Sequence, residues 1–306
     1  MGRFPRRQQG ISVNRPTTKT AALTTIALLA FAGNSVLCRL ALGSNSIDAA
    51  SFTIIRLLSG IMMLSLILIA RRRRDGRAAA TGSWSASLML FIYATAFSFA
   101  YITLDTGTGA LILFGAVQIT MIMIGLFTGH RLHFVEWAGV LMAFSGFVYL
   151  VLPGLTPPSL SGFLLMTAAG VAWGIYTLKG RNSRNPSSDT ACNFLRTLPL
   201  IIILGVVLVI FALPAIHLSP GGILLAILSG ALASGIGYTV WYHALGGLSV
   251  SKAAVVQLLV PVMAALGGVI FASETISLHL MLSSLLVLGG ILIVIRGRDH
   301  IARLSE

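Results

Sequence analysis

Two arginines lie inside apolar segments, where an ionised side chain is expensive unless it has a partner. Arg56 stands in SFTIIRLLSG (51–60) and Arg196 in ACNFLRTLPL (191–200), 140 residues later. A guanidinium in such a setting can snorkel to lipid headgroups, or it can bond the carbonyl groups of loops and helix ends. We keep both interpretations, an anchor and a brace, for Arg56 and Arg196.

Other polar and aromatic side chains in apolar segments carry donors or acceptors that lipid cannot satisfy. Some of them must face a water-filled cavity; the alternatives are hydrogen bonds between helices and an interfacial aromatic belt. The belt is a serious alternative for Trp241, Tyr242 and His243, near the end of a segment. The amides Asn34, Gln118 and Gln257 lie deeper and favour the cavity.

Such a lining would hold an aromatic or aliphatic group by stacking, while amides address an ammonium and a carboxylate. We expect no fixed charge in the deep part of the pathway. A phosphate or nucleotide sugar would call for deep Lys or Arg, so a net-neutral zwitterion is the better match. The expected substrate-binding residues are Asn34, Tyr93, Phe97, Tyr101, Gln118, Trp173, Tyr176, Tyr238, Tyr242 and Gln257.

The eight acidic residues fall in loops, at segment ends or at the termini. Proton- or sodium-driven carriers usually need a carboxylate near the membrane midplane, so this distribution argues against strong ion coupling.

Motifs of enzymes and of metal or cofactor sites are missing from the sequence. There is no GxSxG elbow, no HExxH and no deep acid that could serve as a base. HRLHFVE (130–136) spaces two His and one Glu only faintly like a metal site, and a solvated loop is the better interpretation. The glycine-rich stretches SGALASGIG (229–237) and LGG (288–290) lack the lysine of a phosphate loop and predict close helix packing. We therefore expect no enzyme, no metal and no cofactor.

The elements that position these residues follow from composition, because 56% of the 306 residues are hydrophobic and only 9% are charged. Mean hydropathy is +0.93. The apolar blocks have roughly the 20 residues that a membrane-spanning helix needs. The sequence therefore predicts an all-α polytopic membrane protein with ten spans, at about 21–41, 50–70, 85–104, 109–128, 134–152, 160–178, 192–213, 221–245, 252–272 and 276–295.

The net charge of +13 could suggest nucleic acid, but its distribution indicates a membrane topology. Eighteen of the 21 Lys and Arg, the run RRRRDGR (71–77) among them, fall in segments that are cytoplasmic if the N-terminus is. By the positive-inside rule both termini are expected in the cytoplasm. Arg39, Arg56 and Arg196 need a separate account.

The sequence also indicates an internal repeat, with two copies of one unit. Residues 110–151 align without gaps on 253–294. Further upstream, Gly33 corresponds to Gly174 and Arg56 to Arg196 at nearly the same offset. Five spans per copy would invert the second copy relative to the first, an arrangement typical of alternating-access transporters.

Several residues resemble the EamA-type fold of the drug/metabolite transporter superfamily. They are Trp173-Gly174, the Arg56 and Arg196 positions, YHAL (242–245), LLVPVMAAL (258–266) and SET (273–275). Within that superfamily the chain looks most like bacterial aromatic amino-acid exporters of the YddG type. The first half departs from the pattern, with Gln118 where Pro261 aligns and Arg131 where Glu274 aligns.

The resemblance implies an inner-membrane exporter of aromatic and other hydrophobic neutral amino acids; exporters of drugs, quaternary amines or nucleoside-like metabolites are the alternative. Arg56, Arg196, Pro261 and Glu274 are the expected gating or structural residues. The expected partners are a small-molecule substrate and the lipid bilayer, with a monomer as the working assumption. The expected division is a tail at 1–19, repeats at 20–156 and 157–296, and a tail at 297–306.

Overall fold

We describe the protein from a computed structural model, which describes residues 18–75, 82–127, 133–151, 158–180, 183, 185–248 and 250–304. Most of the N-terminal tail, the loop arginines Arg131, Arg181 and Arg184, and residues 153–157 at the expected boundary between the repeats lie outside the described residues. The side chains of the arginine run at 71–77 also lie outside them.

The described residues form helices joined by short loops. In chain order the helices are α1 (Thr18–Gly43), α2 (Ala49–Asp75), α3 (Trp84–Ala100), α4 (Thr106–Phe127), α5 (Phe134–Val151), α6 (Leu160–Gly180), α7 (Pro186–Leu195), α8 (Leu198–Ala212), η1 (Leu213–Ala215), α9 (Pro220–Leu228), η2 (Ser229–Ile236), α10 (Gly237–Leu245), α11 (Val250–Gln257), α12 (Leu259–Ala272) and α13 (Leu278–Leu304).

Among the described residues, eight helical stretches are long and apolar enough to cross a membrane, judged by length and composition. The helices at Trp84–Ala100 and Phe134–Leu150 are apolar but shorter. The expected class, an all-helical multi-pass membrane protein, is therefore confirmed for the described residues. Ten crossings remain a prediction that depends on these two shorter helices.

Three of the expected spans are not single regular helices. Span 192–213 is divided into α7 and α8, and span 252–272 into α11 and α12. A proline follows each break: Pro199 has no N–H for the carbonyl of Leu195, and Pro261 has none for that of Gln257. Because the proline ring also clashes with that carbonyl, the helix breaks one turn before it.

The third irregular span, 221–245, runs as α9, η2 and α10, where η2 is a π-helix. Its small residues allow a close approach, since a Cβ added to Gly230 would meet the Arg56 carbonyl and the Ser59 hydroxyl of α2. Gly290 of α13 lies in the same way against the Gly139 carbonyl of α5. Both glycine-rich stretches thus serve close helix packing, as expected, because a backbone without Cβ lets neighbouring helices touch.

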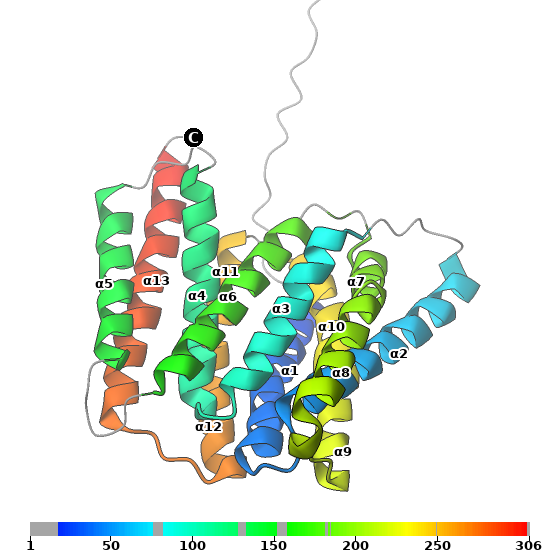
Figure 1. Cartoon of the computed structure of the whole chain (residues 1–306). Coiled ribbons are helices and arrows are strands. Elements are labelled where there is room, and N and C mark those ends of the chain that lie inside the picture. Colours follow the sequence, from blue (N-terminus) through cyan, green and yellow to red (C-terminus); the bar gives the residue numbers. More distant parts are fainter. Residues whose placement is uncertain are drawn as a thin grey trace, which may run out of the picture.

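The helices run side by side, with α5 and α13 together at one edge of the bundle (Figure 1). α1 packs against α10 and α12, while α6 packs against α3 and α4. The starts of α4 and α9 and the end of α12 lie at the lower end in Figure 1, and the end of α13 lies at the upper end. Large apolar side chains such as Ile210, Phe211 and Phe271 are exposed at the outside, as a lipid-facing surface requires.

Candidate functional site

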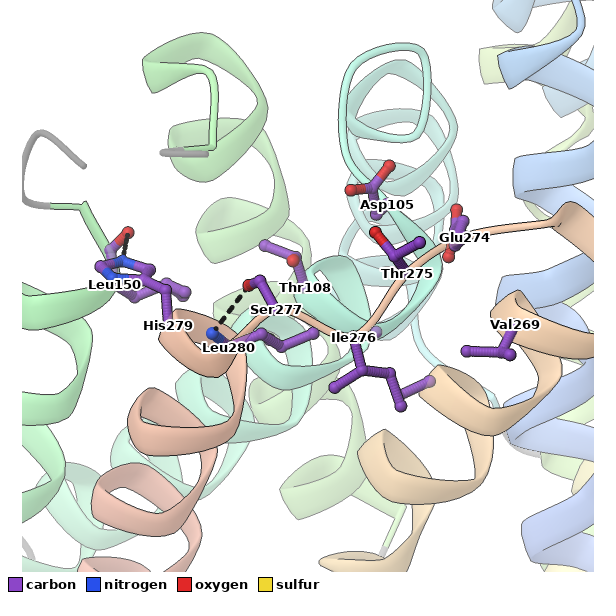
Figure 2. A pocket seen from close by; sticks show the side chains of 12 residues that line it. Asp105, Thr108, Leu150, Val269, Glu274, Thr275, Ile276, Ser277, His279 and Leu280 are labelled. Atoms are coloured by element: carbon purple, nitrogen blue, oxygen red, sulfur yellow. Dashed lines mark hydrogen bonds between the residues drawn. The ribbon is translucent and has the colours of Figure 1, made fainter. Parts of the chain in front are cut away.

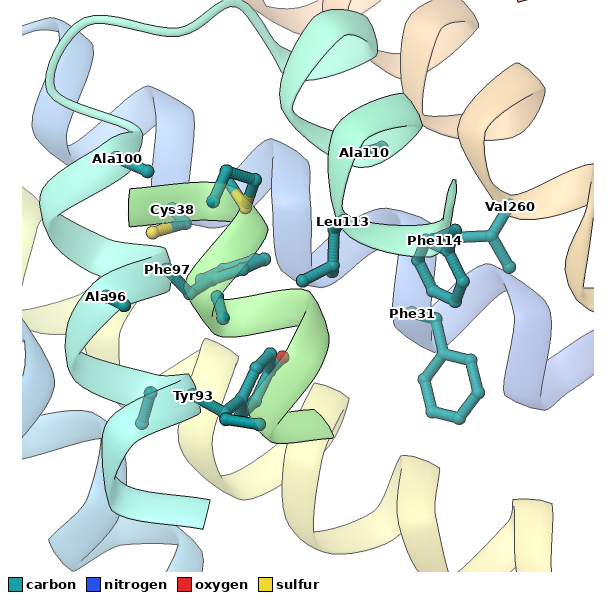
Figure 3. Close-up of a cluster of buried hydrophobic side chains, with 14 of the residues drawn as sticks. Phe31, Cys38, Tyr93, Ala96, Phe97, Ala100, Ala110, Leu113, Phe114 and Val260 are labelled. Carbon is teal, nitrogen blue, oxygen red and sulfur yellow. The ribbon is translucent and has the colours of Figure 1, made fainter. Parts of the chain in front are cut away.

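Aromatic rings from four helices converge in the centre of the bundle. The Trp173 ring on α6 lies 4.8 Å from that of Tyr93 on α3 and 4.9 Å from that of Tyr238 on α10, between centroids. Phe31 of α1 meets Tyr238 edge-on at 6.0 Å. Phe97, one turn beyond Tyr93, lies 5.4 Å from it. Figure 3 shows Tyr93, Phe97 and Phe31 in this cluster, with Leu113 and Phe114 of α4.

These rings surround a central cavity of about 10 Å³, lined by Phe31, Asn34, Ser35, Tyr93, Phe97, Leu113, Phe114, Trp173 and Tyr238. That volume is about what a single water molecule needs. The centre is therefore closed around its aromatic lining, and a larger molecule can occupy it only after helices separate.

A buried polar chain runs beside the central cavity. The Ser229 hydroxyl donates to Asn34 Oδ1 at 2.6 Å, and Asn34 Nδ2 donates to the Tyr93 hydroxyl oxygen at 3.4 Å. The same oxygen accepts a bond from Arg56 Nη2 at 3.0 Å. These contacts join α1, α2, α3 and η2 through side chains that lipid cannot reach.

Arg56 is neither a headgroup anchor nor a brace for loop carbonyls. Its side chain is only 2% exposed, and its guanidinium carbon lies 5.2 Å from the Tyr93 ring centroid and 4.9 Å from that of Phe97. Both expectations for Arg56 were therefore wrong, and so was the expectation that the deep part of the bundle carries no fixed charge. The reason is the orientation of α2 about its own axis, which points the Arg56 side chain towards α3 rather than towards lipid.

Arg196 differs from Arg56 in its surroundings. It forms the C-cap of α7, is partly exposed, and its guanidinium carbon lies 5.7 Å from the Trp84 ring centroid at the start of α3. This place at a helix end is compatible with the expected anchor.

One end of the bundle is closed by an ionic cluster, which we call the latch: Arg39, Asp105 and Glu274. Arg39 Nε donates to Glu274 Oε1 at 3.0 Å, and Arg39 Nη2 donates to Asp105 Oδ1 at 3.0 Å. Arg39 Nη1 also approaches the carbonyl of Tyr101 at 3.4 Å. The latch thus joins the end of α1, the α3–α4 turn and the α12–α13 loop.

The position of the Glu274 side chain is set by the turn of the chain at Ser273 and by the N-terminus of α4. Ser273, with φ 53°, ends α12 in the left-handed conformation, which turns the chain so that the Glu274 N–H bonds the Gly268 carbonyl. Both Glu274 carboxylate oxygens accept from the Thr106 N–H, at 3.0 and 2.9 Å. A carboxylate at a helix N-terminus is favoured by the helix dipole. Figure 2 shows Asp105 and Glu274 on the wall of a 70 Å³ pocket at this end.

The opposite end of the bundle holds a larger cavity of about 350 Å³. It is lined by Met121, Thr177, Leu178, Gly180, Trp241, Tyr242, Leu245, Gly246, Leu248, Ala253, Ala254 and Gln257. Its rim residue Gly246 belongs to the α10–α11 turn, where the adjacent Gly247 lies against Thr20 at the start of α1. Arg39 of the latch is 19 residues further along α1, roughly 28 Å at 1.5 Å per residue.

The expected substrate-binding residues divide into three groups. Asn34, Tyr93, Phe97, Trp173 and Tyr238 line the central cavity, and Tyr242 and Gln257 line the larger one. Tyr101, Gln118 and Tyr176 line neither.

The three residues of the last group have contacts of their own. Tyr101 donates its hydroxyl proton to the Thr106 carbonyl at 3.3 Å, and Tyr176 packs its ring 5.3 Å from Trp173. Gln118 Nε2 reaches the Ala254 carbonyl of α11 at 3.5 Å, which is the helix-to-helix alternative.

Several residues of the site were missed or misjudged. Phe31 lies three residues before Asn34, on the same helix face, and that spacing could have found it. Trp241 is buried at 4% exposure and lines the larger cavity, so the belt interpretation was wrong for it. Arg39 and Asp105 were not paired with Glu274, because the distances between them in the chain give no signal of this contact.

Of the candidate metal spacing at 130–136, His130 lies outside the described residues, and Glu136 has a structural role. Glu136 Oε2 accepts from the His133 backbone N–H at 2.8 Å, at the start of α5. This is the side-chain cap that a glutamate in the first turn commonly provides. Within the described segments, no three His, Cys, Asp or Glu side chains gather as metal ligands.

The described residues form a bundle of apolar helices with a closed polar and aromatic centre, a latched end and a hollow end, an arrangement compatible with a membrane transporter. The model of the EamA-like transporter family matches residues 160–296. The chain is 48% identical over 283 residues to the uncharacterized protein PA1977 of Pseudomonas aeruginosa, covering 92% of this chain and 96% of that protein. It is also 29% identical over 202 residues to an uncharacterized transporter of Archaeoglobus fulgidus, covering 64% of this chain and 70% of that protein.

The match to the EamA-like transporter family thus lies in the second half of the chain. A solved crystal structure that is 19% identical covers 88% of this chain and 98% of its own, with a TM-score of 0.58. At that identity the similarity concerns the fold alone.

Proposed function

We propose that the protein exports aromatic and other hydrophobic neutral amino acids, as the transporters of the YddG type that its sequence resembles do. The observation that carries this proposal is the convergence of Phe31, Tyr93, Phe97, Trp173 and Tyr238 on one central cavity. Stacked and edge-on rings offer an apolar side chain a matching surface, and Asn34 beside them offers donors and an acceptor for polar groups.

Movement by alternating access is supported by the difference between the two ends. The latch closes one end, while the cavity of about 350 Å³ lies near the other. A substrate would enter this cavity, reach the centre as the aromatic rings separate, and leave once the latch opens. The volume falls in the range usual for small-molecule sites.

The packing pattern supports two inverted five-helix repeats. If the halves are exchanged, α1 corresponds to α6, α3 to α10 and α4 to α12. In the first half, α1 packs on α10 and α12 of the second half. The equivalent helix of the second half, α6, packs on the equivalent helices α3 and α4 of the first half. Rocking of one repeat against the other is the motion this symmetry allows.

We place the hollow end at the cytoplasm and the latch at the outer face of the inner membrane. Lys19, Lys179 and Arg296 lie near the hollow end, in the segments that the positive-inside rule assigns to the cytoplasm. The state described here is then open towards the cytoplasm.

We further propose facilitated rather than strongly ion-coupled export. Asp48, Asp105 and Glu274 lie in loops, and Glu136 and Asp189 lie in the first turns of helices. Transport into proteoliposomes with and without an imposed pH gradient tests this point. Equal rates are expected, and strict dependence on the gradient would contradict it.

Export of cationic drugs or quaternary amines is the alternative, since aromatic rings also attract cations. The buried guanidinium of Arg56 beside Tyr93 and Phe97 disfavours a second positive charge at the same place. We therefore rank the amino acids first, and nucleoside-like metabolites, which are neutral, remain a competitor in the assay.

The test is rescue of cells from toxic aromatic amino-acid analogues by expression of the protein. Trp173→Ala removes the ring that contacts both Tyr93 and Tyr238 and is expected to abolish rescue. Trp137→Ala is the matched control, because Trp137 on α5 is 49% exposed and lines neither cavity. Rescue by the wild type from drugs and nucleosides but not from amino-acid analogues would overturn the substrate assignment.

A further inference from the structure

One nitrogen of the buried Arg56 side chain has no partner. Arg56 Nη2 donates to Tyr93, but Nη1 is buried without a hydrogen bond. Across the described side chains, the ion pairs are those of Arg39 with Asp105 and Glu274, and Arg56 takes part in neither. The positive charge of Arg56 is thus enclosed in the bundle without an anion.

The contacts that Arg56 does make compensate only part of that charge. The rings of Tyr93 and Phe97 each attract the guanidinium, and the Tyr93 hydroxyl accepts one hydrogen bond. An arginine has five N–H donors in a planar fork, which matches the two oxygens of a carboxylate. A buried cation that lacks such an anion carries a desolvation cost that an anion would offset.

Arg56 lies next to the central cavity of the proposed pathway. The two rings over which its guanidinium lies are also walls of the central cavity. Asn34, which bonds the same Tyr93 hydroxyl oxygen, lines that cavity as well. Arg56 itself does not line this closed cavity, so an anionic group would reach the unpaired Nη1 only after the Tyr93 and Phe97 rings move aside.

We propose that Arg56 binds the carboxylate of a substrate once the aromatic rings of the central cavity separate. The inference builds on the proposed function and assigns the polar part of the substrate to one side chain. The aromatic rings then hold the apolar group while Arg56 pairs with the carboxylate. A substrate without a carboxylate leaves the buried charge unpaired and is rejected.

Thermal stabilisation of the wild-type protein in detergent tests the preference without any substitution. The probes are L-phenylalanine, its amide L-phenylalaninamide, and phenylacetate, which has the carboxylate but no amine. The phenylalanine concentration needed to stabilise the protein is expected to be at least about tenfold lower than that of its amide, because the carboxylate forms a charge-assisted pair. Equal stabilisation by acid and amide, or no stabilisation by any carboxylate, would overturn the inference.

Substitution then assigns the preference to a residue. Arg56→Gln is expected to abolish the preference for acid over amide in transport by proteoliposomes, and Arg56→Lys to retain part of it. Arg196→Gln is the matched control and should keep the full preference, because Arg196 lies at a helix end over Trp84. A merely structural Arg56 would lower total transport without changing the acid-to-amide ratio, and that result would contradict the assignment.

The outcomes separate this inference from the proposed function. Stabilisation by phenylacetate but not by phenylalanine would retain Arg56 as a carboxylate site and refute amino-acid export. Transport of phenylalanine and its amide at equal rates would retain export of aromatic compounds and refute the role of Arg56. If Arg56→Gln does not fold, the reduced acid-to-amide ratio expected of Arg56→Lys still assigns the preference to this residue, and an unchanged ratio in Arg56→Lys would contradict the assignment.

Discussion

At the scale of residues, charge is used in two contrasting ways. Arg39 has two acidic partners at the edge of the bundle, whereas Arg56 has a hydroxyl and two rings in its interior. A paired charge near the surface costs little to desolvate and can separate again, which suits a gate. An enclosed charge without an anion is costly, which suits a ligand site.

The first prediction concerns the latch. Glu274→Gln removes a charge that Arg39 and the Thr106 N–H both contact, and Glu274 is only 11% exposed as a side chain. Loss of such a charged hydrogen bond costs about 2 kcal/mol, which shifts the ratio of closed to open latch by about thirtyfold. Distances between spin labels at Ser44 and Ile276 should therefore gain a longer population.

Asp105→Asn is the control for the latch experiment, because the Asp105 side chain is 59% exposed and its ion pair is correspondingly weak. It should leave the distances close to those of the wild type. If both variants change the distances equally, or neither does, the latch does not hold this end closed.

At the scale of elements, irregular helices occur where the proposed motion needs them. α11 and α12 separate one turn before Pro261, and Gln257 at that break lines the larger cavity. The π-helix η2 carries Ser229, which bonds Asn34, and Gly230, which touches α2. π-helical insertions are frequent at functional sites because they displace side chains from regular helical positions.

The second prediction concerns the contact of η2 with α2. Gly230→Ala places a methyl group against the Arg56 carbonyl and the Ser59 hydroxyl, so the helices must move apart. Such overpacking typically costs about 1–3 kcal/mol, and we expect a lower melting temperature in detergent.

Gly125→Ala in α4 is the matched control, since a Cβ there meets no heavy atom within 4 Å apart from its chain neighbours and the backbone of its own helix turn. Alanine also favours a helix over glycine by about 1 kcal/mol. This variant should melt no lower than the wild type. Equal melting temperatures for both variants would show that the η2 contact can relax without cost.

At the scale of the whole molecule, the two ends differ in structure and are expected on opposite sides of the membrane. The third prediction tests this in a variant with Cys38→Ala and Cys192→Ala, which removes both cysteines of the chain. Ser44→Cys, exposed in the α1–α2 turn, should react with an impermeant thiol reagent from outside intact cells. Gly246→Cys, at the rim of the larger cavity, should react only after the cells are opened.

Labelling also reports on the cavity itself. L-phenylalanine should slow the reaction of Gly246→Cys more than that of Ser44→Cys, because only Gly246 lines the cavity. Labelling of both positions from the same side would contradict the topology. Protection of neither position would remove the larger cavity from the proposed pathway.

Much of this architecture could be obtained from the order of the residues. Apolar blocks of about 20 residues can cross a bilayer only as helices, because each backbone group must find its partner within its own segment. Asn34, Tyr93, Phe97, Trp173 and Tyr238 could be chosen because polar and aromatic groups inside such blocks need a protected place. They do meet at one cavity.

The direction in which each helix faces was decided by the tertiary structure. A soluble helix shows its buried side by its apolar stripe, but here both the lipid and the protein interior are apolar, so the stripe disappears. For that reason Gln118 could not be assigned to Ala254, nor Arg39 to Glu274, which is 235 residues away. The rotation of α2 turned Arg56 from an expected lipid anchor into an enclosed cation beside the central cavity, because only packing against α3 defines where that side chain points.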